Sequence, residues 1–176
     1  GADLKGVYLH GSAASSGLRP ESDLDVLAVT RRSLKDDQRR VLLDGLLHLS
    51  PALPGVPEGP RRLEVIVVVA GPNVAVSNPR QTDFLYGEWL RKDFSLGILP
   101  MPHNSAGMIL LLAQARETAL PMHGDSLPVQ LPAIPPETIR AALLETAPQL
   151  MSGLVGDERN VLLTLARMWW TAATGT

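Results

Sequence analysis

Residues 62–70, which read RLEVIVVVA, constrain the fold of this chain more than any other stretch. A run of five consecutive Val and Ile residues has no polar face, so a strand built from it must be covered on both sides. Such a strand belongs in the interior of a sheet. Glu64 stands near its start, which is a costly place for a carboxylate that lacks a partner.

Two further strands and a helix precede this central strand. Residues 6–10 and 24–30 are short runs rich in β-branched side chains and bounded by Gly, Pro, Ser and Arg, which is typical of strands. After the second run, apolar residues recur at helical spacing over 33–49, following a Ser33-x-x-Asp36 pattern typical of a helix N-terminus. The alternation of strands with a helix predicts an α/β domain.

Proline-rich stretches divide the rest of the chain. Residues 51–60 hold four prolines and two glycines and are expected to form a loop. Residues 120–136 hold five prolines and are interpreted as a linker. We expect an apolar helix over 106–120 before this linker, and two helices after it, over about 137–151 and 158–173.

Length and composition fit one domain and part of a second. The 176 residues are 45% hydrophobic and 19% charged, which is enough to bury a core. We expect an α/β domain over 1–133 and the start of an all-α domain over 134–176. The chain begins without Met and stops just after a helical pattern, so we expect it to be a fragment.

Charge, cysteine content and hydropathy argue against several classes of protein. The net charge is -2 and the pI is about 6.1, so no broad nucleic-acid-binding face or membrane-surface patch is expected. The absence of cysteine excludes disulfides and thiolate metal sites and fits a reducing compartment. No apolar run reaches the roughly 18 residues of a membrane span. We therefore expect a cytoplasmic protein that binds neither nucleic acid nor membrane.

The stretch between residues 7 and 29 carries the first sign of chemistry. Asp23 and Asp25 lie two positions apart at the start of a strand, so both carboxylates point to the same face. Two like charges that close repel unless a cation lies between them, and Mg²⁺ prefers such oxygen ligands. Upstream, Gly11 lets backbone N–H groups approach a phosphate closely, and Ser12 adds a hydroxyl.

These residues also have structural interpretations. Gly11 and Ser12 alone would form an ordinary turn, and Glu64 could be a solvated acid at a strand end. The four histidines, at 10, 48, 103 and 123, show no paired metal-ligand spacing and are assigned no site. The sequence contains neither a P-loop motif nor GxGxxG.

The combination resembles the signature of the nucleotidyltransferase superfamily, whose fold is DNA polymerase β-like. That signature is Gly followed by Gly or Ser, an acid-hydrophobic-acid triplet further along, and a third acid on a later strand. Here these parts are Gly11-Ser12, Asp23-Leu24-Asp25 and Glu64. His10 stands before Gly11, where an apolar residue is commoner in this superfamily.

Five blocks of sequence make the resemblance more specific. They occur in the order, and at about the spacing, found in the aminoglycoside (3'')(9) adenylyltransferases: LHGSA, GLRPESDLDVLAV, LEVIVVV, FLYGEWLRKD and GDERNVLLTLARMWWTAATG. Those enzymes transfer AMP from ATP to a hydroxyl of streptomycin or spectinomycin. The resemblance implies an α/β (α+β) fold, with a mixed-sheet nucleotidyltransferase domain followed by a truncated all-α domain. We expect a monomer whose partners are ATP and the antibiotic.

The resemblance also implies a role for each motif residue. Asp23 and Asp25 would hold two Mg²⁺ ions, and Glu64 would be the catalytic base that takes the proton of the drug hydroxyl. Gly11 and Ser12 would bind the ATP triphosphate. The other implied residues are Arg167 at the ATP phosphates, Trp89 and Asp157 at the drug, and Arg19 as a weaker ATP contact.

One departure from the family bears on the substrate. Residues 151–155 read MSGLV, where members that accept both drugs usually carry a Trp and a second acid. Losing an aromatic wall and a charge should weaken binding of the larger streptomycin more than of spectinomycin, so spectinomycin ranks first. Asp157 also suits a helix N-cap, and Arg167 could be only a surface charge.

Two alternative functions remain open at this point. A nucleotidyltransferase of the toxin-antitoxin type would modify a protein instead of a drug, and a truncated chain could be an inactive ATP-binding fragment or an interaction module. The intact acids at positions 23, 25 and 64 favour retained chemistry.

Overall fold

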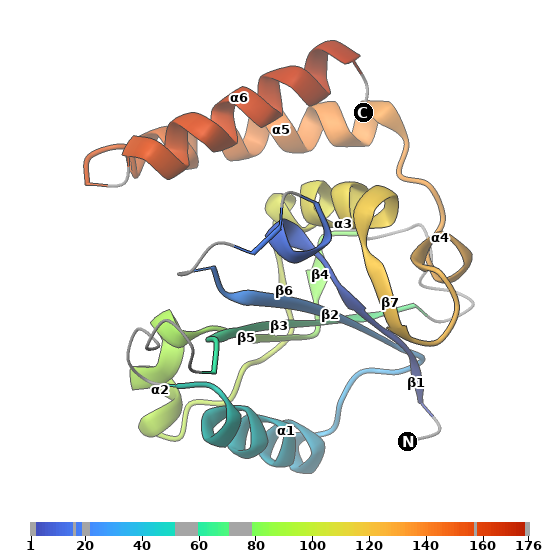
Figure 1. The fold of residues 1–176 in the computed structure, drawn as a ribbon, viewed down its shortest axis with the longest axis vertical. Coiled ribbons are helices and arrows are strands. Elements are labelled where there is room, and N and C mark those ends of the chain that lie inside the picture. The colour runs from blue at the N-terminus through green and yellow to red at the C-terminus, as the bar shows by residue number, and fades with distance from the viewer. Residues whose placement is uncertain are drawn as a thin grey trace.

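A five-stranded mixed sheet forms the centre of the computed structural model (Figure 1). The structure describes residues 3–15, 17–18, 22–51, 60–70, 79–156 and 158–174, with the backbone alone at 159, 160, 167 and 170–174. The strand order across the sheet is β5-β3-β2-β1-β7. The strands are β1 (Leu4–Leu9), β2 (Leu24–Thr30), β3 (Leu63–Val69), β5 (Phe84–Tyr86) and β7 (Leu120–His123).

The parallel pair in this sheet is β2 with β3, and the other neighbouring strands are antiparallel. Helix α1 (Asp36–Leu49) connects the two parallel strands, as a parallel pair requires a crossover connection. Strand β3 lies between β2 and β5 and is buried from Val65 to Val68. This confirms the prediction that residues 62–70 form an interior strand.

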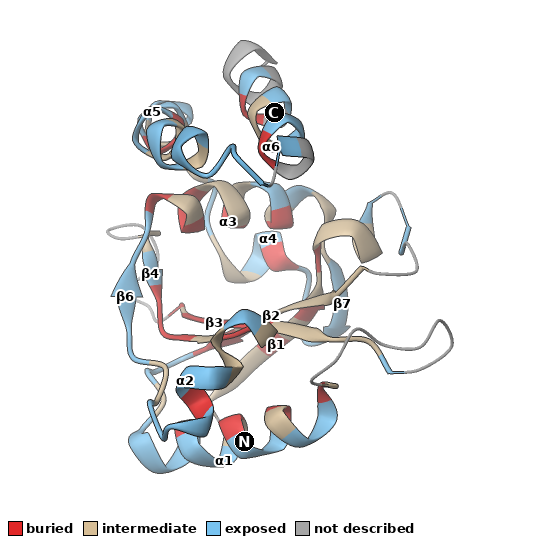
Figure 2. Cartoon of the chain, turned by 90° about the vertical axis from the view of Figure 1, so that its left-hand side faces the viewer, coloured by how far each residue is buried: buried red, intermediate tan, exposed pale blue. Residues whose placement is uncertain are grey.

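Helices cover both faces of the sheet, and the buried residues follow the strands and the helix sides that face them (Figure 2). Strands β1, β2 and β3 pack on one face against α3 (Ala106–Thr118) and α4 (Leu127–Gln130). That core cluster contains Tyr8, Leu27, Val29, Ile66, Val68, Met108, Leu112 and Leu127. The other face packs against α1, and its cluster contains Leu43, Leu46, Val65, Val67, Phe84, Tyr86 and Phe94.

Two long helices, α5 (Pro136–Ser152) and α6 (Glu158–Thr174), lie beyond α3 (Figure 1). Their positions agree with the helices predicted over 137–151 and 158–173. Ala142 of α5 is fully buried, and it packs against Ala106 and Ile109 of α3. The helical part therefore rests on the α3 face of the sheet domain, while the boundary between residues 133 and 134 stays a prediction.

The interpretation of residues 120–136 as a linker is wrong. Residues Leu120–His123 form β7, which pairs with β1, and α4 follows shortly afterwards. The Tyr8 hydroxyl, on β1, donates to the carbonyl oxygen of Asp125 at 2.7 Å and fixes the intervening turn. Prolines fit here because β7 is an edge strand and Pro128 lies in the first turn of α4.

The predicted start of the first helix at Ser33 is also wrong. Helix α1 begins at Asp36, where the Gln38 side chain accepts a hydrogen bond from the Lys35 backbone N–H at 2.9 Å. The Ser33 hydroxyl instead donates to Asp83 Oδ1 at 2.5 Å and accepts from Arg39 Nη2 at 3.0 Å. Ser33 is exposed but binds the buried side chains of Asp83 and Arg39, and it does not cap the helix.

The remaining elements are short. Strands β4 (Gln81–Thr82) and β6 (His103–Asn104) form a separate two-stranded sheet. The loop predicted over 51–60 lies mostly outside the described residues. The other short elements are η1 (Gly11–Ala14), η2 (Glu88–Leu90) and α2 (Arg91–Ser95). Among the residues that the structure describes, no helix has the length and apolar content needed to cross a membrane.

Candidate active site

The three predicted acids meet on one face of the sheet. Strands β2 and β3 run parallel with Asp25 directly opposite Glu64, and Asp23 immediately precedes β2. Because side chains alternate along a strand, Asp25 and Glu64 point to the face that carries Leu27 and Ile66. This is the face on which α3, α5 and α6 lie (Figure 1).

Burial and mutual repulsion change the acidity of this cluster. Burial, and then the neighbouring charge of Asp23, raise the pKa of Asp25 to about 6. Burial, then the charges of Asp25 and Asp23, raise the pKa of Glu64 to about 7. Within the described residues, the carboxylates of Asp25 and Glu64 have neither a hydrogen bond nor an ion pair. The cluster therefore holds more negative charge than the protein itself neutralises.

Gly11 lies directly against this cluster. It begins η1 with a φ of +62°, in the left-handed region that favours glycine. A Cβ at this position would stand 2.0 Å from Asp25 Oδ2. The backbone N–H of His10 donates to the carbonyl oxygen of Asp25 at 3.0 Å, which holds the turn beside β2. The structure thus brings Gly11 to the acids, and Ser12 follows it on the same turn.

We expect Gly11→Ala to disturb the site strongly, although the substitution adds only one methyl group. The new Cβ would displace the Asp25 carboxylate, and Ala would be strained at this φ, so we expect activity to fall about tenfold to a hundredfold. Gly17→Ala is the matched control, because Gly17 also has a positive φ, of +84°, but a Cβ there meets no atom within 4 Å. Turnover assays of both variants check this prediction, and equal losses would contradict it.

His10 is a site neighbour that the sequence interpretation left unassigned. It is buried, and burial lowers the pKa of its imidazole, so the ring is neutral near physiological pH. Its Nε2 atom has no hydrogen-bond partner among the described residues. The sequence pattern indicates no role for His10, because no second histidine stands at metal-ligand spacing.

Arg62 is a second residue that the sequence interpretation missed. Its Nε donates to Asp23 Oδ1 at 3.0 Å, with the two side chains 33% and 30% exposed. Its carbonyl oxygen accepts from the Leu24 backbone N–H at 2.9 Å, which fixes the Arg62 main chain beside the start of β2. A signal was present, because Arg62 stands two positions before Glu64 and alternation places both on the same face.

Trp89 lies on η2, just beyond the strand that borders β3. Strand β5 ends at Tyr86, opposite Val65, so the chain leaves the sheet close to Glu64. The Trp89 ring lies over Gly87, where a Cβ would stand 2.3 Å from the ring. Its side chain remains 60% exposed. The structure thus places an exposed indole near the acid-bearing end of β3.

A hydrogen-bond network around Glu88 fixes this segment. Burial would raise the pKa of Glu88, but hydrogen bonds from Arg91, Ser50 and Tyr86 outweigh it and lower the pKa to about 2. The Ser50 hydroxyl donates to Glu88 at 2.5 Å and accepts from the Leu63 backbone N–H at 3.1 Å. Through Ser50, the network therefore links Glu88, which precedes Trp89, to Leu63, which precedes Glu64.

Three predicted residues cannot be placed at the site by their side chains. Arg19 and Asp157 lie outside the described residues, and Arg167 belongs to α6 with only its backbone described. The turn after α5, which precedes Asp157, lies on the same side of the molecule as the start of β2 and β3 (Figure 1).

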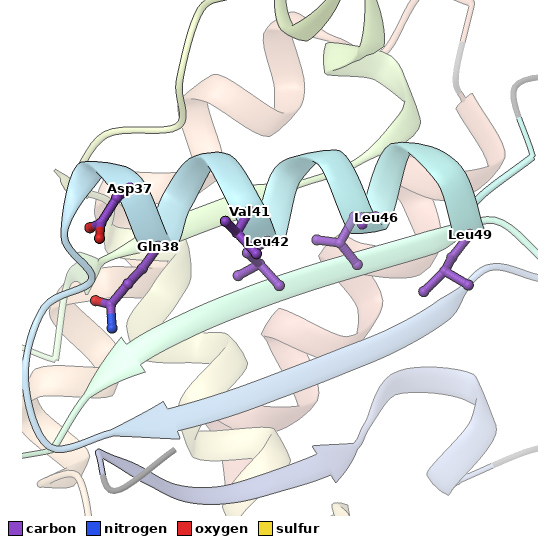
Figure 3. Close-up of a pocket in the computed structure, with 7 residues that line it drawn as sticks. Asp37, Gln38, Val41, Leu42, Leu46 and Leu49 are labelled. Atoms are coloured by element: carbon purple, nitrogen blue, oxygen red, sulfur yellow. The ribbon is translucent and has the colours of Figure 1, made fainter.

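An apolar groove of about 480 Å³ along α1 is separate from the acids. Its lining includes Val41, Leu42 and Leu49, whose side chains follow one flank of the helix (Figure 3). Helix α1 packs on the face of the sheet that carries Val65 and Val67, whereas Glu64 points to the opposite face. The groove therefore is not part of the candidate site.

Comparison with known proteins gives consistent matches. A family model described as the C-terminal domain of aminoglycoside adenylyltransferase matches residues 130–176. A spectinomycin 9-adenylyltransferase of Staphylococcus aureus is 41% identical over 175 residues, which cover 99% of this chain and 67% of the relative. An aminoglycoside (3'') (9) adenylyltransferase of Klebsiella pneumoniae is 36% identical over 174 residues, covering 98% of this chain and 66% of the relative.

A solved structure shows the same fold. The crystal structure of an Enterococcus spectinomycin adenyltransferase with ATP and spectinomycin matches with a TM-score of 0.89 and 31% identity, covering 99% of this chain and 71% of that one. This confirms the predicted mixed-sheet nucleotidyltransferase fold. The chain spans about two thirds of the length of the relatives it matches. By sequence and by fold, the chain belongs to the aminoglycoside adenylyltransferase family.

Proposed function

We propose that this protein transfers AMP from ATP to a hydroxyl of an aminoglycoside-type antibiotic and releases pyrophosphate, with spectinomycin as the preferred substrate. The observation that carries the proposal is the convergence of Asp23, Asp25 and Glu64 beside the turn at Gly11. Relatives named spectinomycin 9-adenylyltransferase, at 41% and 39% identity, support the choice of drug. The absence of a Trp in residues 151–155 supports the same choice.

Asp23 and Asp25 would hold Mg²⁺ in this reaction. No three His, Asp or Glu side chains in the described ranges form a complete metal site. Mg²⁺ does not require one, because it takes one or two carboxylates and fills its shell with water and substrate phosphates. The donor set fits: among the described residues the Asp25 carboxylate has no ion pair, and at Gly11 a side chain would fill the space beside Asp25. When bound, Mg²⁺ neutralises charge on the reacting phosphate oxygens.

Glu64 would act as the general base. A pKa raised to about 7 leaves this carboxyl partly protonated near neutral pH, and a protonated carboxyl cannot accept a proton. A cation beside Asp25 would lower the pKa of Glu64 and keep it ionised. The ionised carboxylate could then take the proton of the drug hydroxyl as the oxygen attacks the α-phosphate.

The other implied residues have roles that suit their chemistry. Gly11 and Ser12 would bind the triphosphate through backbone N–H groups and the Ser12 hydroxyl, and Arg167 would reach the phosphates from α6. Trp89 would form a flat wall against the drug, and Asp157 would pair with a drug amine. The exposed position of the Trp89 ring near β3 supports its assignment.

Pyrophosphate release tests this proposal. We expect the purified protein, with ATP and Mg²⁺, to release pyrophosphate when spectinomycin is added and to do so more slowly with streptomycin. Asp25→Asn is the matched control, and we expect it to lose at least about a hundredfold in rate. A failure to release pyrophosphate with either drug would contradict the antibiotic assignment. Equal rates with both drugs would contradict the ranking alone.

A further inference from the structure

We propose that Arg62 is a positioning residue of the metal site, whose guanidinium pairs with Asp23 when no metal is bound and gives it up when a divalent cation binds. The inference rests on the proposed function, because it needs Asp23 to be a metal ligand. It adds a residue to which none of the sequence motifs assigned a role.

Two hydrogen bonds hold Arg62 beside Asp23. The Nε atom donates to Asp23 Oδ1 at 3.0 Å. The guanidinium therefore occupies an oxygen of one of the two proposed metal ligands. The Arg62 main chain cannot drift away, because its carbonyl oxygen accepts from the Leu24 backbone N–H at 2.9 Å. Arg62 is therefore held beside Asp23 by the sheet itself.

The three acids of the site carry like charges that Arg62 partly balances. Asp23, Asp25 and Glu64 repel one another, and only Asp23 among them has an ion pair within the described residues. Arg62 removes part of this repulsion when no metal is present. A divalent cation at the same carboxylate supplies more charge at shorter range, so the guanidinium and the metal compete for Asp23.

The ion pair between Arg62 and Asp23 is partly exposed to solvent. The side chains of Arg62 and Asp23 are 33% and 30% exposed, so water and ions reach the pair. Partly exposed ion pairs are weak enough to open at little cost, whereas a fully buried pair would resist a metal. The geometry thus fits an ion pair that holds Asp23 in place without metal and opens when a metal ion binds.

Removing the positive charge should strengthen metal binding. We expect Arg62→Gln to bind Mn²⁺, used alone as the probe without ATP or drug, about threefold to tenfold more tightly than the wild-type protein. The metal-free variant should unfold at a lower temperature than the wild type, and Mn²⁺ should raise its unfolding temperature by more. Neither readout depends on turnover.

The neighbouring arginine supplies a matched control. Arg61 donates to the carbonyl oxygen of Ser22 at 2.9 Å, so Arg61→Gln makes the same change in net charge one residue away. We expect its Mn²⁺ affinity to stay within about twofold of the wild-type value, because Arg61 binds a main-chain carbonyl oxygen whereas Arg62 binds a carboxylate oxygen of the site. Arg62→Lys, which keeps the charge, should also stay close to the wild type.

A measurement on the unmodified protein makes the test independent of how the variants fold. The ¹H–¹⁵N NMR signal of Arg62 Nε should be protected from exchange by the Asp23 carboxylate, and adding Mg²⁺ should shift it and remove this protection. A signal that does not respond to Mg²⁺ would overturn the proposal. So would Mn²⁺ affinity in Arg62→Gln that is equal to or weaker than wild type. If neither wild type nor variants bind Mn²⁺, the proposed metal site fails together with this inference.

Discussion

Replacing Glu64 by Gln is expected to lower the rate of AMP transfer by about 10²–10⁴, because an amide cannot accept the proton of the attacking hydroxyl. The same substitution should make the metal-free protein more stable near neutral pH. Both effects follow from one carboxylate that lies half-buried beside Asp25 and Asp23.

The direction of the stability effect follows from proton binding. Burial and the charges of Asp25 and Asp23 raise the pKa of Glu64 from an ordinary value of 4.5 to about 7, so the folded state holds this proton more tightly than the unfolded state. The metal-free protein therefore loses stability as the pH rises between about 4.5 and 7. Gln carries no such charge, and we expect a gain of about 1–3 kcal/mol at neutral pH.

Thermal unfolding across this pH range, together with pyrophosphate release, checks both effects. Glu117→Gln on α3 is the matched control, because it makes the same chemical change at a side chain that is 72% exposed. Mg²⁺ should stabilise the wild type more than Glu64→Gln, because its charge offsets the repulsion between Glu64 and the two aspartates, and Gln has no such repulsion. Glu64→Gln protein that keeps more than about a tenth of the wild-type rate would show that Glu64 is not the base.

Replacing Asp83 by Ala is expected to destabilise the protein by about 3–5 kcal/mol. Asp83 and Arg39 are both 1% exposed, and Arg39 Nη2 donates to Asp83 Oδ1 at 3.0 Å. Arg39 also donates to the carbonyl oxygens of Asp83 and Pro100. Without the carboxylate, a buried guanidinium would lose its countercharge, and the Ser33 hydroxyl and Leu34 backbone N–H would each lose an acceptor.

A surface ion pair provides the control for this prediction. Arg80 and Glu145 form an ion pair at 2.7 Å, but their side chains are 36% and 50% exposed. We expect Glu145→Ala to change the free energy of unfolding by less than about 1 kcal/mol. Chemical denaturation of the two variants measures the difference. Similar losses in both would contradict the prediction that the buried pair of Asp83 and Arg39 contributes more to stability than the exposed pair.

Local patterns in the sequence predicted the elements that carry the acids. Residues 24–30 form β2 at the predicted bounds, and β3 differs from the predicted 62–70 by one residue at each end. These strands could be predicted because their hydrophobic pattern is short-range and unbroken. The spacing of Asp23 and Asp25 likewise fixed their shared face without any knowledge of tertiary contacts.

Features that depend on distant partners could not be predicted in this way. The five prolines of residues 120–136 favoured a linker, whereas β7 forms because it pairs with β1, more than a hundred residues earlier in the chain. The pairs Arg62–Asp23 and Arg39–Asp83 join residues 39 and 44 positions apart, and neither spacing is a helical or strand period. Such contacts are set by packing of the whole domain.

The mass of spectinomycin after incubation with the protein, ATP and Mg²⁺ tests the central claim most directly. The account predicts a drug product that carries one added AMP moiety. The product should form with the wild-type protein and at least about a hundredfold more slowly with Asp25→Asn, because the acids on β2 and β3 form the site of transfer. Unmodified drug after incubation with wild-type protein would contradict the account, and so would an equal yield of adenylylated drug from Asp25→Asn.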